Sequence, residues 1–153
     1  MTLIKSISGI RGTIGGHQAE NLTPIDVVKF TTAYARLIKD KNPGKRITVV
    51  VGRDARISGS MVDSLVEGTL LGTGVNVINV GMCTTPGTEM AVITHKADGG
   101  IIITASHNPR QWNALKLLNE RGEFLDDAEG KQVLAMAEDV EWDYPTIDNI
   151  GKV

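Results

Sequence analysis

The chain has 153 residues, of which 41% are hydrophobic and 22% are charged, and its formal net charge at pH 7 is −2. This length and balance indicate one globular domain with a buried core, and they exclude an intrinsically disordered chain. The small net charge and the 4% aromatic content also argue against a nucleic-acid-binding protein, which needs a basic surface and stacking platforms.

The first predicted helix follows Thr23. Apolar residues recur at helical spacing from 27 to 38, Thr23 can act as the N-cap, and Pro24 suits the first helical position. Asn42-Pro43-Gly44 then ends this helix.

Strands and helices alternate along the rest of the chain. Short β-branched or apolar runs predict buried strands at 47–51, 75–80 and 101–104. A second helix is predicted between the first two of these strands, with Ser60 as its N-cap and Gly72 or Gly74 at its end. Thr85-Pro86 opens a third helix that runs toward His95. Such alternation is typical of an α/β domain with a largely parallel sheet and helices on both faces.

One connection is too short for a helical crossover. Few residues separate Thr104 from the apolar-alternating stretch 114–118, so this last strand should run antiparallel. Residues 119–122 then form a turn, and 123–125 form a short edge piece before a final helix at Asp126-Asp127. We expect a domain over residues 1–139, and we expect 140–153 to be a linker toward a second domain.

The sequence also bears on the cellular compartment. Cys83 is the only cysteine, so neither a disulfide framework nor a cysteine-rich zinc site is expected. The segment 1–5 lacks the hydrophobic region of a signal peptide, and no apolar run approaches the ~18 residues that span a bilayer. We therefore expect a cytoplasmic protein with neither a membrane nor a nucleic acid as a partner.

Polar or glycine-rich segments occupy four places where functional loops of an α/β sheet are expected, after the carboxyl ends of strands. They are Ser8-Gly9-Ile10-Arg11-Gly12, Gly52-Arg53-Asp54, Thr84-Thr85-Pro86 and Thr104-Ala105-Ser106-His107-Asn108-Pro109. Each is weak evidence by itself. Glycine with arginine often marks a turn with a solvated charge, and Arg53-Asp54 also fits a structural ion pair.

Ser106 and His107 are the most informative pair. A serine after a strand can simply cap a turn, and adjacent residues on an extended chain point apart, which argues against a Ser–His nucleophile and base. A phosphorylated Ser106 would instead add up to two negative charges at the mouth of the sheet. Arg11, Lys116 and loop amides could converge there. The pattern alone therefore predicts a phosphate site at the loop ends.

Residues 104–109, Thr-Ala-Ser-His-Asn-Pro, resemble the phosphoserine signature of the α-D-phosphohexomutases, which include phosphoglucomutases, phosphomannomutases and phosphoglucosamine mutases. Residues 8–12, 51–54 and 113–116 resemble three further motifs of this family, in the same order. The resemblance runs from Ile4 to about Asp139. It implies the first, N-terminal domain of such an enzyme, a three-layer α/β/α domain with a small mixed sheet, mostly parallel with the last strand antiparallel.

The resemblance also implies roles for individual residues. Ser106 would carry the phosphoryl group, and His107 would contact the transferring phosphate or the sugar hydroxyl. Lys116 matches the general base or acid, and Arg11 matches an arginine near the transferring phosphate. The residues that would support the phosphate loop are Asn108, Arg53 and Asp54.

The family's usual ion is Mg²⁺, to which Ser106 would contribute a ligand through its phosphate, with the other ligands outside this chain. The expected partners are a hexose phosphate and the remaining domains of the same polypeptide, which hold the family's magnesium, sugar and phosphate loops. One departure is Ala114, which replaces the glycine of Asn-Gly-x-Lys and would be strained if that position needed a positive φ.

We therefore expect that the full-length protein interconverts hexose 1-phosphate and hexose 6-phosphate through a bisphosphorylated sugar, and that this fragment alone is inactive. Phosphomannomutase or phosphoglucomutase is the first choice, and phosphoglucosamine mutase is close behind. A non-catalytic phosphate-binding module and a phosphatase that uses Ser106 remain alternatives.

Overall fold

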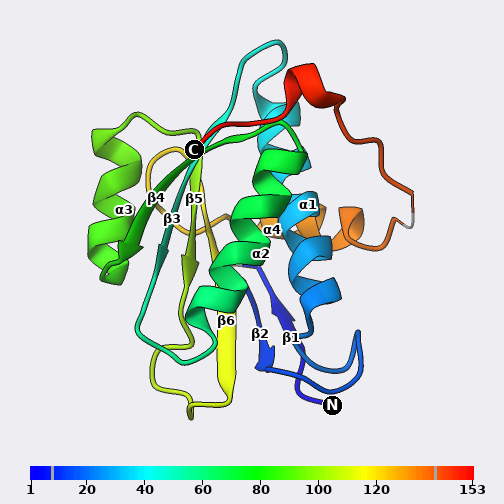
Figure 1. Ribbon diagram of the computed structural model, residues 1–153, viewed down its shortest axis with the longest axis vertical. Coiled ribbons are helices and arrows are strands. Elements are labelled where there is room, and N and C mark those ends of the chain that lie inside the picture. Colours follow the sequence, from blue (N-terminus) through cyan, green and yellow to red (C-terminus); the bar gives the residue numbers. More distant parts are fainter. Residues whose placement is uncertain (8, 140) are drawn as a thin grey trace.

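The computed structural model describes residues 1–7, 9–139 and 141–153, which alternate between strands and helices around one sheet (Figure 1). The strands are β1 (Ile4–Ser6), β2 (Gly9–Thr13), β3 (Thr48–Arg53), β4 (Asn76–Met82), β5 (Gly99–Ile103) and β6 (Trp112–Leu118). The helices are α1 (Pro24–Lys41), α2 (Gly59–Gly72), α3 (Thr85–Thr94) and α4 (Asp127–Met136), followed by the short 3₁₀ helix η1 (Ile147–Asn149). Within the described ranges, no helix has the length and apolar character needed to cross a membrane.

The sheet is mixed, with the strand order β1-β2-β6-β5-β3-β4. β3 pairs in parallel with both β4 and β5, and β6 runs antiparallel to β5, as the short connection after Thr104 predicts. β2 adds antiparallel to β6, and β1 adds antiparallel to β2. This N-terminal hairpin is a correction, because residues 9–12 were expected in a loop. Glycine is a poor strand former and β2 contains two glycines, so pairing with β6 imposes the extended conformation here.

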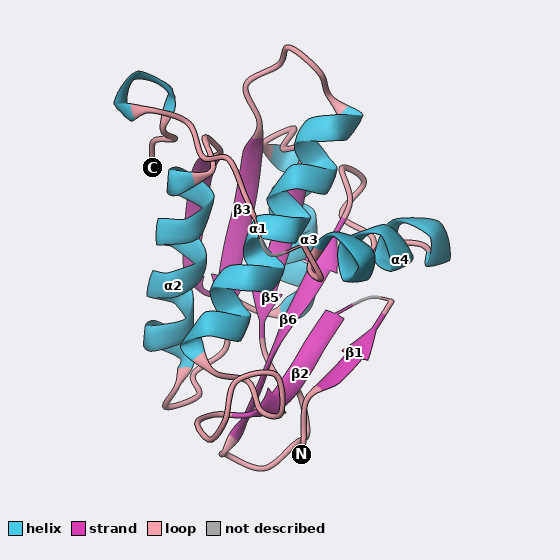
Figure 2. Cartoon of the chain, turned by 90° about the vertical axis from the view of Figure 1, so that its right-hand side faces the viewer, coloured by secondary structure: helices cyan, strands magenta, loops and turns pink. Residues whose placement is uncertain are grey.

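Helices cover both faces of the sheet, which confirms the three-layer α/β/α prediction. α2 and α4 both pack against α1 on one face, and α3 packs against β3 and β5 on the other (Figures 1 and 2). Alternation along the strands divides the core accordingly. Val49 and Val51 belong to the larger cluster beneath α1 and α2, whereas Val50 and Ile102 belong to the smaller cluster beneath α3.

The helix ends follow local capping signals with one exception. α1 begins at Pro24 after the N-cap Thr23, as predicted. α4 begins at Asp127, where the last helix was expected to begin, and Asp126 is its N-cap. α2 begins at Gly59 with Ser58 as its N-cap, and not with Ser60. The Ser58 hydroxyl accepts a hydrogen bond from Asn113 Nδ2 on β6 at 2.8 Å. This long-range contact lies outside the local pattern from which the cap was predicted.

The segment 141–153 lies against the domain. The Gly151 N–H donates to the Leu71 carbonyl at 2.8 Å, and the Val77 N–H donates to the Lys152 carbonyl at 2.9 Å. Trp142 packs against the larger core cluster. Val140 lies outside the described residues. That this segment leads into a second domain stays a prediction.

The Tyr34 hydroxyl joins α1 to the centre of the sheet. It accepts from the Gly100 N–H at 2.9 Å and donates to the Leu118 carbonyl at 2.6 Å, so it bridges β5 and β6. Tyr34 is fully buried, and burial raises the pKa of its hydroxyl far above the ordinary value. A Cβ at position 99 would collide with this hydroxyl, which explains Gly99 at the start of β5.

We expect Tyr34→Phe to lower the free energy of unfolding by about 1–3 kcal/mol, because it leaves a buried N–H and a buried carbonyl without their partner. Urea unfolding measures the change. Tyr144→Phe is the matched control, since that hydroxyl lies on a half-exposed side chain and contacts only Thr32 among the described residues. Equal effects of the two substitutions would contradict the bridging role of Tyr34.

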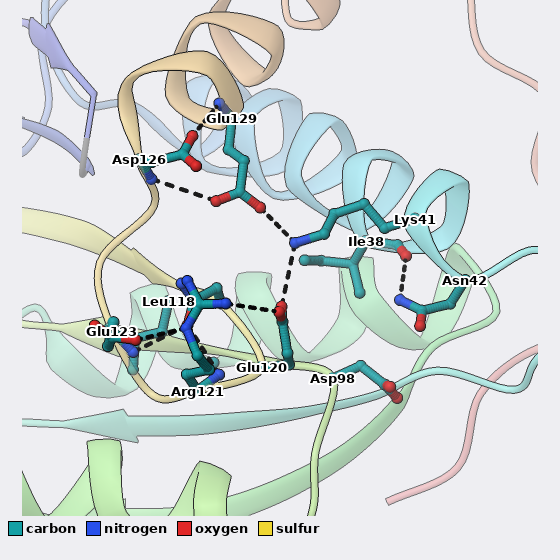
Figure 3. Close-up of polar contacts among 12 residues, drawn as sticks. Ile38, Lys41, Asn42, Asp98, Leu118, Glu120, Arg121, Glu123, Asp126 and Glu129 are labelled. Atoms are coloured by element: carbon teal, nitrogen blue, oxygen red, sulfur yellow. Dashed lines mark hydrogen bonds and ion pairs between the residues drawn. The ribbon is translucent and has the colours of Figure 1, made fainter.

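An ion cluster ties the end of α1 to the β6–α4 region. Figure 3 shows the Lys41 ammonium between the carboxylates of Glu129 and Glu120, the latter at 3.2 Å. Burial lowers the pKa of Lys41, but its hydrogen bonds to the two glutamates outweigh this and raise it. A hydrogen bond from its own backbone amide, together with Lys41, lowers the pKa of Glu120 below its ordinary value of 4.5.

Because the pKa of Glu120 is lower in the folded state, its contribution to stability is present above pH 4.5 and is lost as the pH falls through the folded pKa. We expect Glu120→Gln to destabilise the protein at pH 7 by about 0.5 kcal/mol, a typical value for a partly exposed pair. Urea unfolding at pH 7 and pH 3 should show this difference shrinking on acidification, whereas Glu20→Gln on an exposed site should change little at either pH. A difference that stays constant with pH would count against the ion cluster.

Candidate active site

Ser106 lies in the connection between β5 and β6 with a backbone φ of +53°, in the left-handed region. Serine adopts this conformation at a cost of roughly 1–2 kcal/mol. Its N–H donates to Thr104 Oγ1 at 3.1 Å, and its exposed Oγ accepts a hydrogen bond from Lys116 Nζ at 2.7 Å. The strained turn therefore presents the serine hydroxyl to the lysine.

Arg11 and Lys116 point to the same face of the sheet. Ile10 pairs with Leu115 across β2 and β6, and both side chains enter the larger core. The residues that flank this pair, Arg11 and Lys116 among them, must point to the opposite face because side chains alternate along a strand. Arg11 thus reaches the site from strand β2, and not from the loop that the sequence predicted.

These side chains line a hollow of about 220 Å³ beside the β5–β6 connection. Its lining includes five of the predicted site residues: Arg11, Ser106, His107, Asn108 and Lys116. An adjoining hollow of about 160 Å³ shares Arg11 and Lys116 and continues toward β1. Within the part of the chain that the structure describes, the lining carries two strong cations and no carboxylate. The hollow therefore favours a dianion such as a phosphate ester.

Ala114 forms part of the lining of both hollows. It is not among the described non-glycine residues with positive φ, which are Ala19, Lys96 and Ser106. Its position in β6 is ordinary extended backbone. The replacement of glycine by alanine in Asn-Ala-x-Lys therefore introduces no backbone strain, and Lys116 reaches Ser106 despite it.

Asp54 stabilises the β5–β6 connection that carries Ser106. Its carboxylate accepts from Thr104 Oγ1 at 2.6 Å and forms an ion pair with Arg56, with 3.3 Å between Nε and Oδ2. Arg53 is not brought to the hollow. It turns toward α2, where its Nε lies 3.4 Å from Asp63 Oδ2. The two residues therefore pair with other partners, which corrects the alternative of an Arg53–Asp54 ion pair.

The carboxylate that Arg53 contacts is itself perturbed. Burial, with a further contribution from Glu67, raises the pKa of Asp63, and this outweighs the opposing effects of the Asn79 hydrogen bond and of Arg53. The ion pair with Asp63 on α2 thus places the Arg53 side chain between β3 and α2.

Arg56 is the residue that the sequence reasoning missed. Its guanidinium reaches backbone carbonyls of the Ser106 connection, about 50 positions further along the chain. A charged residue just after Asp54 carries no sequence signal of such a contact, because an exposed charge beside a turn is the ordinary interpretation. Ser8 of the first motif lies outside the described residues.

The described residues do not form a cation site on their own. They contain no group of three or more His, Cys, Asp or Glu side chains that could hold a metal ion. Asp54, the carboxylate beneath the Ser106 connection, is already engaged by Thr104 and Arg56.

The comparisons with known proteins agree with this geometry. Residues 3–143 match the family model described as phosphoglucomutase/phosphomannomutase, alpha/beta/alpha domain I. The chain belongs to this family. A phosphoglucomutase/phosphomannomutase of Thermococcus kodakarensis is 46% identical over 72% of the chain and 25% of its own length. A phosphoglucosamine mutase of Chromobacterium violaceum is 36% identical over 84% of the chain and 28% of its own length.

A solved structure supports the fold of this phosphoglucomutase/phosphomannomutase domain. The family protein from Burkholderia thailandensis superposes with a TM-score of 0.78 at 23% identity, over 99% of the chain and 33% of that protein. The chain therefore spans between a quarter and a third of the length of these relatives.

Proposed function

We propose that the full-length protein is a phosphohexomutase that interconverts hexose 1-phosphate and hexose 6-phosphate through a phosphorylated Ser106. The observation that carries this proposal is the 2.7 Å hydrogen bond from Lys116 Nζ to Ser106 Oγ, within a hollow lined by cations. Membership of the phosphoglucomutase/phosphomannomutase family supports the same reaction.

The geometry suggests how the transfer would proceed. The bond between phosphorus and Ser106 Oγ breaks while a bond forms from phosphorus to the oxygen of the free sugar hydroxyl. That hydroxyl loses its proton, and Ser106 Oγ takes one up, so the transfer leaves a free serine. Negative charge develops on Oγ as it leaves, and the Lys116 ammonium, whose Nζ lies 2.7 Å from Oγ, would stabilise that charge or supply the proton. Arg11 would neutralise the oxygens of the transferring group. His107 would contact this phosphate or the sugar hydroxyl.

The product of the first transfer is a bisphosphorylated sugar. When it turns over in the site, its other phosphate faces Ser106 and returns to Oγ, which restores the phosphoserine. Two equivalent transfers thus replace one difficult migration, as in other covalent catalysis.

Phosphoglucosamine mutase is the second candidate for the sugar, because a relative of that name matches 84% of the chain. Assay of the full-length protein against mannose, glucose and glucosamine phosphates separates these candidates. Hydrolysis without transfer to a sugar would instead favour the phosphatase alternative, and binding without turnover would favour the phosphate-binding module.

The same proposal includes further groups from outside this chain. Mg²⁺ would be held by the phosphoserine and by carboxylates of other domains, and it would supply charge neutralisation at the phosphate. Residues 1–139 would form the phosphoserine domain, and 140–153 would lead to the next one. The location would be cytoplasmic, as expected from the sequence.

We expect Ser106→Ala in the full-length protein to fold normally and to lose most of its turnover, because the phosphoryl carrier is gone. Mass spectrometry of freshly purified wild type should find phosphate on the peptide that contains Ser106. If Ser106 only caps a turn, the substitution should instead lower stability by ~1 kcal/mol and leave activity intact. An active wild type without phosphate at Ser106, together with an unchanged rate of Ser106→Ala, would remove the carrier role.

We expect Lys116→Ala and Arg11→Ala each to lower kcat on the order of 10²-fold or more, the usual effect of lost proton transfer or charge stabilisation. Steady-state kinetics of the full-length protein measures this. Lys5→Ala is the matched control, because Lys5 lies on the neighbouring strand β1 and pairs with Glu138. Near-normal turnover of both site variants would show that the assigned roles are wrong.

A further inference from the structure

Arg56 uses every N–H of its guanidinium. It lies between β3 and α2, and only 11% of its side chain is exposed. Its Nε donates to Asp54 Oδ2 at 3.3 Å. The two Nη groups make four bonds to backbone carbonyls, at 2.8 Å from Pro109, 3.1 Å from Trp112, 2.8 Å from Ser106 and 2.8 Å from Asn108.

The four carbonyls all belong to the segment 106–112. Four carbonyl dipoles that converge on one point repel one another unless a cation lies among them, and a planar guanidinium meets several acceptors at once. The same segment contains Ser106 in its left-handed conformation, which persists only where surrounding contacts over-determine it. The four hydrogen bonds from Arg56 to this segment are contacts of that kind.

The anchor of Arg56 is itself fixed to the sheet. The Asp54 N–H donates to the Ile103 carbonyl at 3.1 Å, and the Asp54 carboxylate accepts from Thr104 Oγ1, which in turn receives the Ser106 N–H. A continuous set of hydrogen bonds therefore runs from the end of β5 through Asp54 and Arg56 to both sides of Ser106.

We infer that Arg56 is the positioning residue that holds Ser106 within reach of Lys116. This inference rests on the proposed function of Ser106 as the phosphoryl carrier. Arg56 touches no reacting atom, since its contacts are to backbone carbonyls and Asp54, and it acts by fixing the turn that presents Oγ. A lysine at this position keeps the charge but has three donors on a compact ammonium, so it can replace only some of the hydrogen bonds that Arg56 makes.

The test uses the full-length protein with Arg56→Gln, Arg56→Lys and the control Arg46→Gln. Arg46 also donates to backbone carbonyls, those of Gly74 and Asn149, but it lies far from the hollow and holds the segment 141–153. We expect amide hydrogen exchange within 104–112 to rise at least tenfold in Arg56→Gln, with the rest of the domain unchanged.

We expect kcat of Arg56→Gln to fall on the order of 10²-fold, as for a displacement of about 1 Å at a reacting group. KM for the hexose phosphate should stay within about threefold, because the sugar is bound by other groups. Arg56→Lys should recover part of the lost kcat and part of the lost protection from exchange in 104–112. Arg46→Gln should retain the wild-type kcat and the wild-type exchange in 104–112.

Two outcomes would overturn the positioning role: exchange in 104–112 and kcat that match wild type, or exchange that rises evenly over the whole domain. Should Arg56→Gln fail to fold, the same comparison is made with Arg56→Lys. Failure of the proposed function is seen separately, because wild type would then carry no phosphate on Ser106 while the exchange measurement still reports whether Arg56 holds the segment.

Discussion

The connection between β5 and β6 is too short to cross the sheet through a helix, and the arrangement of the site depends on this constraint. β6 must return antiparallel beside β5, and the observed register pairs Ile102 with Lys116. Lys116 therefore lies close to the turn that carries Ser106. The return also leaves the other edge of β6 free, and β2 pairs with that edge and brings Arg11 to the same face.

The uneven covering of the two faces explains why charged side chains gather where they do. On one face α1, α2 and α4 bury a large apolar cluster, which includes residues from β2 and β6. On the other face α3 covers β3 and β5, and the cluster beneath it is small. Arg11 and Lys116 lie beyond that helix, where solvent reaches them and burial does not penalise their charge. The hollow is thus the part of the outer layer that no helix fills.

The accuracy of the sequence predictions follows the range of the interactions involved. The cap of α1 and the starting point of α4 were predicted, because capping and helical spacing are local signals. β2 was not predicted, because its glycines and arginine fit a loop as well as a strand and only the edge of β6 decides between them. The cap of α2 was misplaced for a related reason, since Asn113 fixes Ser58 from another strand.

The same distinction applies to the site. The motifs pointed to Ser106, His107, Asn108, Lys116 and Arg11, and the structure brings these together around one hollow. Arg53 and Asp54 are adjacent in sequence, yet their side chains part at the end of β3, and only Asp54 reaches the Ser106 connection. Arg56 could not be found from the sequence, because its carbonyl partners impose no residue type that a reader could recognise.

The left-handed backbone at Ser106 creates a conflict between two requirements, because this φ favours glycine whereas the proposed reaction needs a hydroxyl. Glycine would adopt this φ at no steric cost, so replacing the serine should relieve strain of roughly 1–2 kcal/mol even as it removes the hydroxyl. Selection for thermostability alone would therefore push this position away from serine, while the proposed role as phosphoryl carrier would require the serine to stay. Such a trade-off is characteristic of functional sites, where the best residue for the reaction is not the best residue for the fold.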